Sequence, residues 1–274
     1  MNLPNFNSLV EAYLKAQRKL YSGKQQGSLF PADPDIGADP KFQEMAYRLA
    51  YRMSQMVAAA NMRSWREAAM KSARAKEIYR SLQEEIRRTG LQPELQVIAQ
   101  RNAKLIRSVP REIAQHLTQK AVTLHQEGKR DKEIISELKR LAPHLTRSKM
   151  RLIARTEISR SETDLTRLRA ENIGITHYQW VTSEDRRVRD SHRNLDKVLI
   201  AWNDAPQPEA LIGEKSTLGR GHAGTFPNCR CLCAPLVSLD EITWPAKYYS
   251  HGSIRRVSRA QFVKLLSAGQ LVAA

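Results

Sequence analysis

Cysteine is nearly absent from this chain: its 274 residues include three, all within the stretch TFPNCRCLC at residues 225–233. An odd number argues against a framework of disulfides. A bridge between Cys229 and Cys231, or between Cys231 and Cys233, would also close a strained small ring. The cysteines therefore indicate free thiols or a metal site.

Long apolar runs are missing as well. Runs such as LIAW from Leu199 and VAAA from Val57 are short, whereas a membrane-spanning helix needs about 20 apolar residues. The opening residues, MNLPNFNSLVEAYLKAQ, do not show the basic region, apolar stretch and small-residue cleavage site of a secretory signal. We therefore expect no membrane partner, and folding in a cytoplasm.

Acidic residues are outnumbered, since 28 Asp and Glu accompany 45 Lys and Arg and leave a net charge of +17. A hydrophobic content of 41% is still enough to bury a core. The excess charge favours a polyanionic partner, because guanidinium groups bind phosphate oxygens through paired hydrogen bonds. The alternative is an ordinary basic surface in contact with water. We expect non-specific contact with double-stranded DNA through Arg147, Lys149, Arg151, Arg155, Arg160, Arg186 and Arg187.

Glycine and proline are scarce in the helical patterns, but residues 22–40 contain three of each. This composition predicts an N-terminal arm and hinge over residues 1–40. Within the arm, the sequence SLVEAYLKAQRKLY favours a short amphipathic helix. Its apolar side chains, available to dock on another surface, are Leu9, Tyr13, Leu20 and Tyr21.

Residues 41–89 contain neither glycine nor proline, which predicts a long helix. Apolar residues step along it by four and three, the spacing of a coiled-coil seam that could support self-association. At the next seam position, Arg63 replaces an apolar residue, so we expect a bend or a change of packing partner there. The seam residues are Phe42, Ala46, Leu49, Met53, Met56 and Ala60.

The remaining patterns predict a mainly α fold, with elongated N-terminal helices and a helical bundle followed by a small irregular α+β module. The helical body covers residues 41–173, and its later helices are expected at 94–107, 110–127, 132–141 and about 146–172. Aromatic and β-branched runs place the module at residues 174–237. Residues 238–274 are expected to form a basic C-terminal tail with a short helix that a capping box of Ser258 and Gln261 opens.

The cysteines are candidates for one structural zinc site. Cys229 and Cys231 alternate along the chain, so an extended backbone places both thiols on the same side. His192, with either His222 or Asp190, would complete a tetrahedron. The alternative is that the cysteines pack as small apolar side chains.

Three other functions compete for these residues. A nucleophilic Cys229 with His192 as its base has no evident orienting residue or oxyanion turn. A metal-dependent nuclease of the His-Asn-His type would use His192, Asn194 and His222. A helix-turn-helix regulator would place its turn at APHLTRS, residues 142–148, although this turn is long and has no glycine.

The order of several short motifs is more specific than any one of them. ARTE at residues 154–157 precedes HYQWVT, which contains Trp180, and then come DRRVRDSH at 185–192 and PNCRC at 227–231. In this order the chain resembles, over roughly residues 110–236, the minor head proteins of tailed bacteriophages, the Mu F-like head morphogenesis family. The positions that match are Arg155, Thr156, Glu157, Trp180, Asp185, Val188, Arg189, His192, Cys229, Arg230 and Cys231.

The chain departs from the family pattern at two places. Lys197 stands where the family commonly has glycine, and the Pro-Gly-rich lead into the cysteines is reduced to GRGHAGTFPN.

The resemblance implies a structural virion protein that acts inside the head, near the portal vertex, after assembly in the host cytoplasm. Its implied partners are the portal protein, the major capsid or scaffolding protein, and packaged DNA, and its implied roles are head assembly, DNA packaging or genome ejection. Some relatives carry an enzymatic toxin after the motif region. About forty residues follow Cys233 here, too few for a usual catalytic domain, so we expect no enzyme activity.

Overall fold

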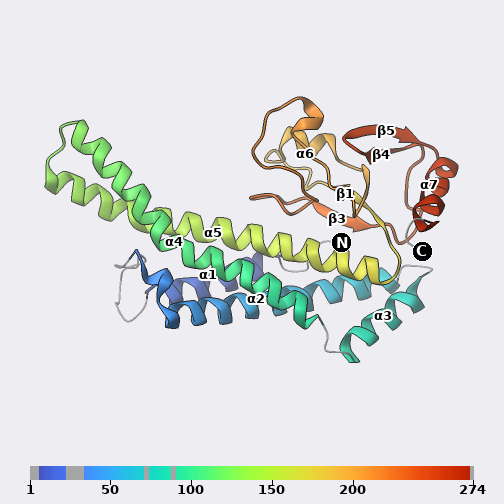
Figure 1. Ribbon diagram of the computed structural model, residues 1–274, viewed down its shortest axis with the longest axis horizontal. Helices are drawn as coiled ribbons and strands as arrows, with labels where there is room; N and C mark the ends of the chain where they lie inside the picture. Colours follow the sequence, from blue (N-terminus) through green and yellow to red (C-terminus); the bar gives the residue numbers. More distant parts are fainter. Residues whose placement is uncertain (1–5, 23–33, 71–73, 88–90, 272–274) are drawn as a thin grey trace. The chain divides into compact units, whose positions relative to one another are not determined.

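A computed structural model of the protein describes residues 6–22, 34–70, 74–87 and 91–271, and it is mainly helical with one small sheet (Figure 1). The α-helices are α1 (Phe6–Ser22), α2 (Pro40–Met70), α3 (Ala75–Arg87), α4 (Gln92–Gln126), α5 (Asp131–Asn172), α6 (Asp190–Asn194) and α7 (Arg259–Leu271). The strands are β1 (His177–Val181), β2 (Leu199–Ala201), β3 (Leu232–Pro235), β4 (Ala246–Ser250) and β5 (Ser253–Val257). Short 3-10 helices cover Ile36–Ala38 and Ala210–Ile212. The predicted fold class is confirmed.

The predicted hinge falls largely on residues 23–33, outside the described residues. None of the helices in the described ranges has a stretch both long and apolar enough to cross a membrane.

The chain forms two compact units, and two of its helices contribute to both. The helical unit draws on residues 5–57 and 91–158, and the motif unit on residues 58–90 and 159–274. Helix α2 therefore changes packing partner at residues 57–58, earlier than the predicted position near residue 63. It passes residue 63 without a break and ends at Met70.

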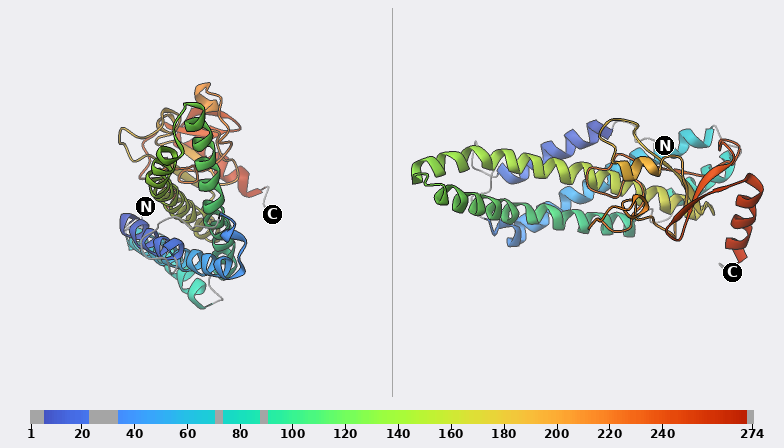
Figure 2. Two further views of the ribbon diagram at one scale, coloured as in Figure 1. Left: turned by 90° about the vertical axis from the view of Figure 1, so that its left-hand side faces the viewer. Right: turned by 90° about the horizontal axis from the view of Figure 1, so that it is seen from above.

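In the helical unit, α4 and the first part of α5 run antiparallel and side by side (Figure 2). Helix α1 packs on α4 through two buried tyrosines that the sequence presented as a docking face. The Tyr13 hydroxyl donates to Asn102 Oδ1 at 2.9 Å, and the Tyr21 hydroxyl donates to the carbonyl of Ile106 at 2.7 Å. The partner of this face is thus helix α4 of the same chain.

The prediction of separate helices at 94–107 and 110–127, and at 132–141 and 146–172, is wrong. Each pair is one helix, with Pro110 inside α4 and Pro143 inside α5. A proline within a helix costs about 3 kcal/mol, because it removes a hydrogen bond and crowds the preceding turn. Burial of apolar side chains on both sides, such as Ile106 and Ile113 around Pro110, offsets that cost. The APHLTRS segment is helical, which contradicts the helix-turn-helix alternative.

The motif unit is built on a mixed sheet with the strand order β3-β1-β2-β4-β5. Strand β1 pairs antiparallel with β2 and β3, whereas β2 and β4 are parallel. Successive side chains point to opposite faces, so Ile200 joins one apolar cluster with Tyr178 and Trp180, and Leu199 joins another with Phe262.

Residues 238–274, predicted as a tail with a short helix, also contribute strands β4 and β5 to this sheet. The predicted capping box is confirmed. The Gln261 backbone N–H donates to Ser258 Oγ at 3.3 Å, and the Ser258 backbone N–H donates to Gln261 Oε1 at 2.8 Å.

A buried polar network joins α2, α3 and α5 within the motif unit. The Arg169 guanidinium donates to both carboxylate oxygens of Glu85, at 2.9 and 2.7 Å, and also bonds Asn61. Asn61 in turn donates to Thr166 at 2.6 Å and to Glu162 at 3.3 Å. Burial raises the pKa of Glu162 to about 7. Because ionised groups are costly to bury unless they are paired, this network depends on the Arg169–Glu85 pair.

We predict that Glu85→Ala destabilises the protein by about 3–5 kcal/mol, because it leaves the Arg169 charge buried without its partner. The matched control is Glu171→Ala, which breaks the half-exposed pair with Arg167 on the same helix and should cost at most about 1 kcal/mol. Urea unfolding of the three proteins measures both effects. Equal losses in the two variants would contradict the assigned role of the pair.

Candidate metal centre

The DRRVRDSH and PNCRC segments lie against each other, although residues 193–226 separate them in the chain. The Arg230 guanidinium bonds both carboxylate oxygens of Asp185, and Arg189 donates to the carbonyl of Pro227 at 2.8 Å. The hydrogen bonds from Arg230 hold the pKa of Asp185 below its usual range, and the Arg187 backbone N–H adds to this effect. The two segments are thus joined by charge-assisted bonds.

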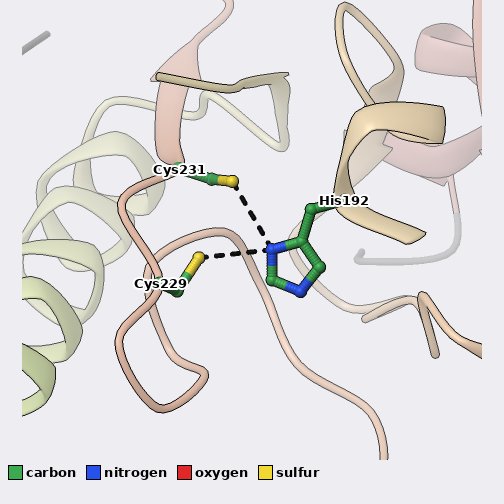
Figure 3. A group of neighbouring side chains, drawn as sticks. All are labelled: His192, Cys229 and Cys231. Carbon is green, nitrogen blue, oxygen red and sulfur yellow. Dashed lines mark hydrogen bonds between the residues drawn. The ribbon is translucent and has the colours of Figure 1, made fainter. Parts of the chain in front are cut away.

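His192 and two cysteines meet where the segments join (Figure 3). His192 Nδ1 lies 3.4 Å from Cys229 Sγ and 3.5 Å from Cys231 Sγ. The three side chains are 2–4% exposed, and one ligand atom from each lies within 4.8 Å of the others. Helix α6 supplies the histidine, and the chain leading into β3 supplies both thiols.

Aromatic rings enclose the histidine. The edge-to-face contact with Trp180 has ring centroids 5.3 Å apart, and that with Phe226 has them 5.1 Å apart. The sequence patterns did not single out Phe226 as a residue of this site. Its position directly before the PNCRC segment could have indicated it. His192 Nε2 is buried and has no hydrogen-bond partner within the described part of the chain.

The two thiols differ in acidity. A hydrogen bond from the Cys231 thiol lowers the pKa of Cys229 well below the ordinary value, and His192 adds to this effect, although burial opposes it. The hydrogen bond to Cys229, together with burial, raises the pKa of Cys231. One thiolate is therefore favoured beside a neutral thiol, and thiolate is the form that binds metals.

The structure does not bring the other predicted ligands into this group. The His222 ring nitrogen Nδ1 shares a hydrogen bond of 3.0 Å with the Tyr178 hydroxyl, and the His222 ring packs on Trp202. Asp190 is 80% exposed and pairs with Arg193 at 2.6 Å. Cys233, which was not among the predicted ligands, donates to the carbonyl of Ala223 at 3.6 Å. Within the described residues, the metal-binding group consists of His192, Cys229 and Cys231.

This arrangement of side chains does not favour either of the two enzymatic alternatives. His192 and His222 face different partners, whereas a His-Asn-His nuclease needs them around one ion. Thiolate and imidazole donors also suit zinc rather than the magnesium of such nucleases. As a nucleophile, Cys229 would be only 4% exposed, and its histidine has no orienting partner at Nε2 among the described residues.

The candidate DNA contacts divide between the two units. Residues 147–155 belong to the helical unit, where Arg147 and Arg151 are exposed, Arg155 is half-buried, and Lys149 pairs with Glu112 at 2.5 Å. The candidates in the motif unit, all exposed, are Arg160, Arg186 and Arg187.

The ARTE motif serves the packing of α5 on α4. Glu157 is 1% exposed and accepts a hydrogen bond of 2.9 Å from Arg101. This ion pair within the helical unit gives Glu157 a structural role.

Comparison with known proteins matches residues 111–234 to the family described as Phage Mu protein F like protein. Residues 111–234 form a Mu F-like region. The resemblance stated from the motifs is thereby confirmed. An uncharacterised protein of Haemophilus influenzae is 27% identical over 140 residues, which cover 51% of this chain and 29% of that relative. No solved structure gives a significant match.

Lys197 is the position at which the motif comparison predicted a departure from the family pattern, and the structure gives its backbone conformation. Lys197 has a φ of 61°, in the left-handed region that favours glycine. Its backbone N–H donates to the carbonyl of Trp180 at 2.8 Å, which joins the turn before β2 to strand β1. The lysine thus keeps a backbone conformation suited to glycine.

We predict that Lys197→Gly stabilises the protein by about 0.5–1 kcal/mol, because it relieves the strain of a left-handed residue with a Cβ. Lys197→Ala keeps that Cβ and serves as the control for loss of the exposed side chain. Chemical denaturation measures both variants. A glycine variant no more stable than the alanine variant would refute the strain at this turn.

We also predict that stability falls as the pH drops from about 6.5 to 4. Burial, and then the Arg167 charge, lower the pKa of His222 to about 4, so in this window the unfolded chain binds a proton that the folded chain does not. His222→Gln should flatten the decline by up to about 1.4 kcal/mol per pH unit. His251→Gln, at an exposed site, should leave it unchanged. Denaturation curves across this pH range give the comparison, and parallel curves for all three proteins would exclude His222 as the cause.

Proposed function

We propose that this protein is a minor head protein of a tailed bacteriophage that acts inside the head, at or near the portal vertex, as a component of the virion. The observation that carries the proposal is the Mu F-like match over residues 111–234, which includes both motif segments. Those segments are far apart in sequence and pack into one site around His192.

The proposed role is architectural. His192, Cys229 and Cys231 are buried, and the partly exposed Asp185, Arg189 and Arg230 around them form an ion pair and a hydrogen bond that join the two motif segments. Such a site stabilises a loop-rich module, whereas hydrolysis would require a substrate to reach it. The protein therefore takes part in head assembly, DNA packaging or genome ejection without catalysing a reaction.

Contact with packaged DNA is the second part of the proposal. A net charge of +17 favours a polyanion. Arg147 and Arg151 lie one turn apart on α5, are exposed, and form no ion pair with another described residue. Both guanidinium groups are therefore available for phosphate oxygens, and the contact would be independent of sequence.

The portal assignment is tested by co-expression with the portal and major capsid proteins of the same phage, followed by crosslinking. We expect crosslinks from residues 1–90 to the portal protein and a few copies per head. Crosslinks spread over the capsid protein alone, with many copies per head, would contradict a place at the portal vertex.

For DNA contact, we predict that Arg147→Gln combined with Arg151→Gln weakens binding and reduces the slope of log affinity against log salt by about two. The control combines Arg48→Gln and Arg140→Gln, which remove the same charge from arginines paired with Glu44 and Glu137. A salt titration with unrelated DNA duplexes measures both.

Two outcomes would count against this contact: equal slopes for the two double variants, or a strong preference for one duplex sequence. Incubation of the same proteins with plasmid and magnesium addresses the nuclease alternative. Cleavage by the wild type that is lost in His192→Ala would overturn the non-catalytic role.

A further inference from the structure

We propose that His192, Cys229 and Cys231 bind one zinc ion, with water as the fourth ligand, and that this ion fastens the long connection between β2 and β3 to helix α6. The inference rests on the side chains themselves and does not depend on the phage function.

The distances agree with three corners of a zinc tetrahedron. Zinc binds thiolate sulfur at about 2.3 Å and imidazole nitrogen at about 2.0–2.1 Å, so tetrahedral angles place these ligand atoms about 3.6 Å apart. His192 Nδ1 lies 3.4 and 3.5 Å from the two sulfur atoms. An ion can therefore enter with small shifts of three side chains.

The ligand types select the metal. Two thiolates and a neutral imidazole are soft donors that favour zinc over magnesium or calcium. The two thiolates also cancel the double charge of the ion, so the occupied site would be neutral in its buried setting.

The surroundings hold the ligands in place before any ion binds. Arg230 lies between the two cysteines in sequence, and its ion pair with Asp185 ties the cysteine segment to the segment that carries His192. The bond from Arg189 to Pro227 is a second tie. Supporting bonds of this kind orient metal ligands in proteins.

The fourth ligand would come from solvent. All three ligand residues line a pocket of about 90 Å³, whose other walls include Ser183 and Asn228. Water in this pocket could reach the ion. With Nδ1 on the metal, His192 Nε2 would carry the proton, and water could also accept this hydrogen bond, for which the described residues offer no partner.

The connection that the ion would fasten has little regular structure. Between β2 and β3, residues 202–231 contain only the short 3-10 helix Ala210–Ile212. A metal ion that crosslinks a long connection of this kind stabilises the fold strongly, because the free energy of metal binding adds directly to the free energy of folding.

The test is metal analysis of the full chain, purified without a histidine tag and with a reducing agent. We expect about one zinc per chain in the wild type. Cys229→Ser, Cys231→Ser and His192→Ala should each lose at least about tenfold in zinc affinity, as measured by competition with a chromogenic chelator. Cys233→Ser and His222→Gln are the matched controls, because these buried residues lie outside the group, and both should retain zinc.

A second measurement uses the wild type alone, so it tests the site even if the variants do not fold. Zinc is removed from the wild type with a chelator, and cobalt(II) alone is added as the probe. We expect the intense visible bands of tetrahedral cobalt and a thiolate charge-transfer band at one equivalent. Addition of zinc should abolish these bands.

Three results would overturn the proposal: wild-type protein without zinc whose thiols react freely in the native state, a Cys229–Cys231 disulfide seen as a mass 2 Da lower, or full zinc retention in Cys229→Ser. Each would leave the crosslinking and DNA experiments unaffected, so failure of the metal site is distinguishable from failure of the proposed function.

Discussion

The ion pair between Asp185 and Arg230 links two segments that local chain structure could not bring together. Neighbouring side chains along an extended chain point to opposite sides. When Arg230 turns toward Asp185, the flanking residues Cys229 and Cys231 are therefore directed to the other side, where His192 lies. This pairing, together with the bond from Arg189 to Pro227, holds the cysteine segment beside His192.

The rest of the motif unit supports that junction. Trp180 on β1 pairs in register with Cys233 on β3 and packs its ring against His192. Helix α5 is bonded to the connection between β2 and β3, since the Thr163 hydroxyl donates to the carbonyl of Ala223 at 2.7 Å. Gly224 is required at this contact, because a Cβ there would lie 2.6 Å from the Thr163 hydroxyl oxygen. Helix, sheet and loop therefore converge on one small buried centre.

Charge is used differently inside and on the surface. Within the motif unit, Arg169 forms a buried ion pair with Glu85, which stabilises the fold, and the partly exposed Arg230 pairs with Asp185. On the surface, Arg147 and Arg151 form no ion pair with a described residue, and these are the arginines that we propose contact packaged DNA. This division between paired and unpaired arginines is compatible with the role in the phage head that we propose from the Mu F-like match.

Local spacing determined much of this protein from sequence alone. The mainly helical body, the capping box of Ser258 and Gln261, the motif order and the alternation of Cys229 and Cys231 all depend on neighbours in the chain, so they were predictable. Tertiary structure decided the rest. Helices α4 and α5 run through their prolines because burial along both helices offsets the local cost. His192 meets Cys229 and Cys231, whereas the predicted further ligands His222 and Asp190 do not, because the path of the whole chain determines which distant side chains meet.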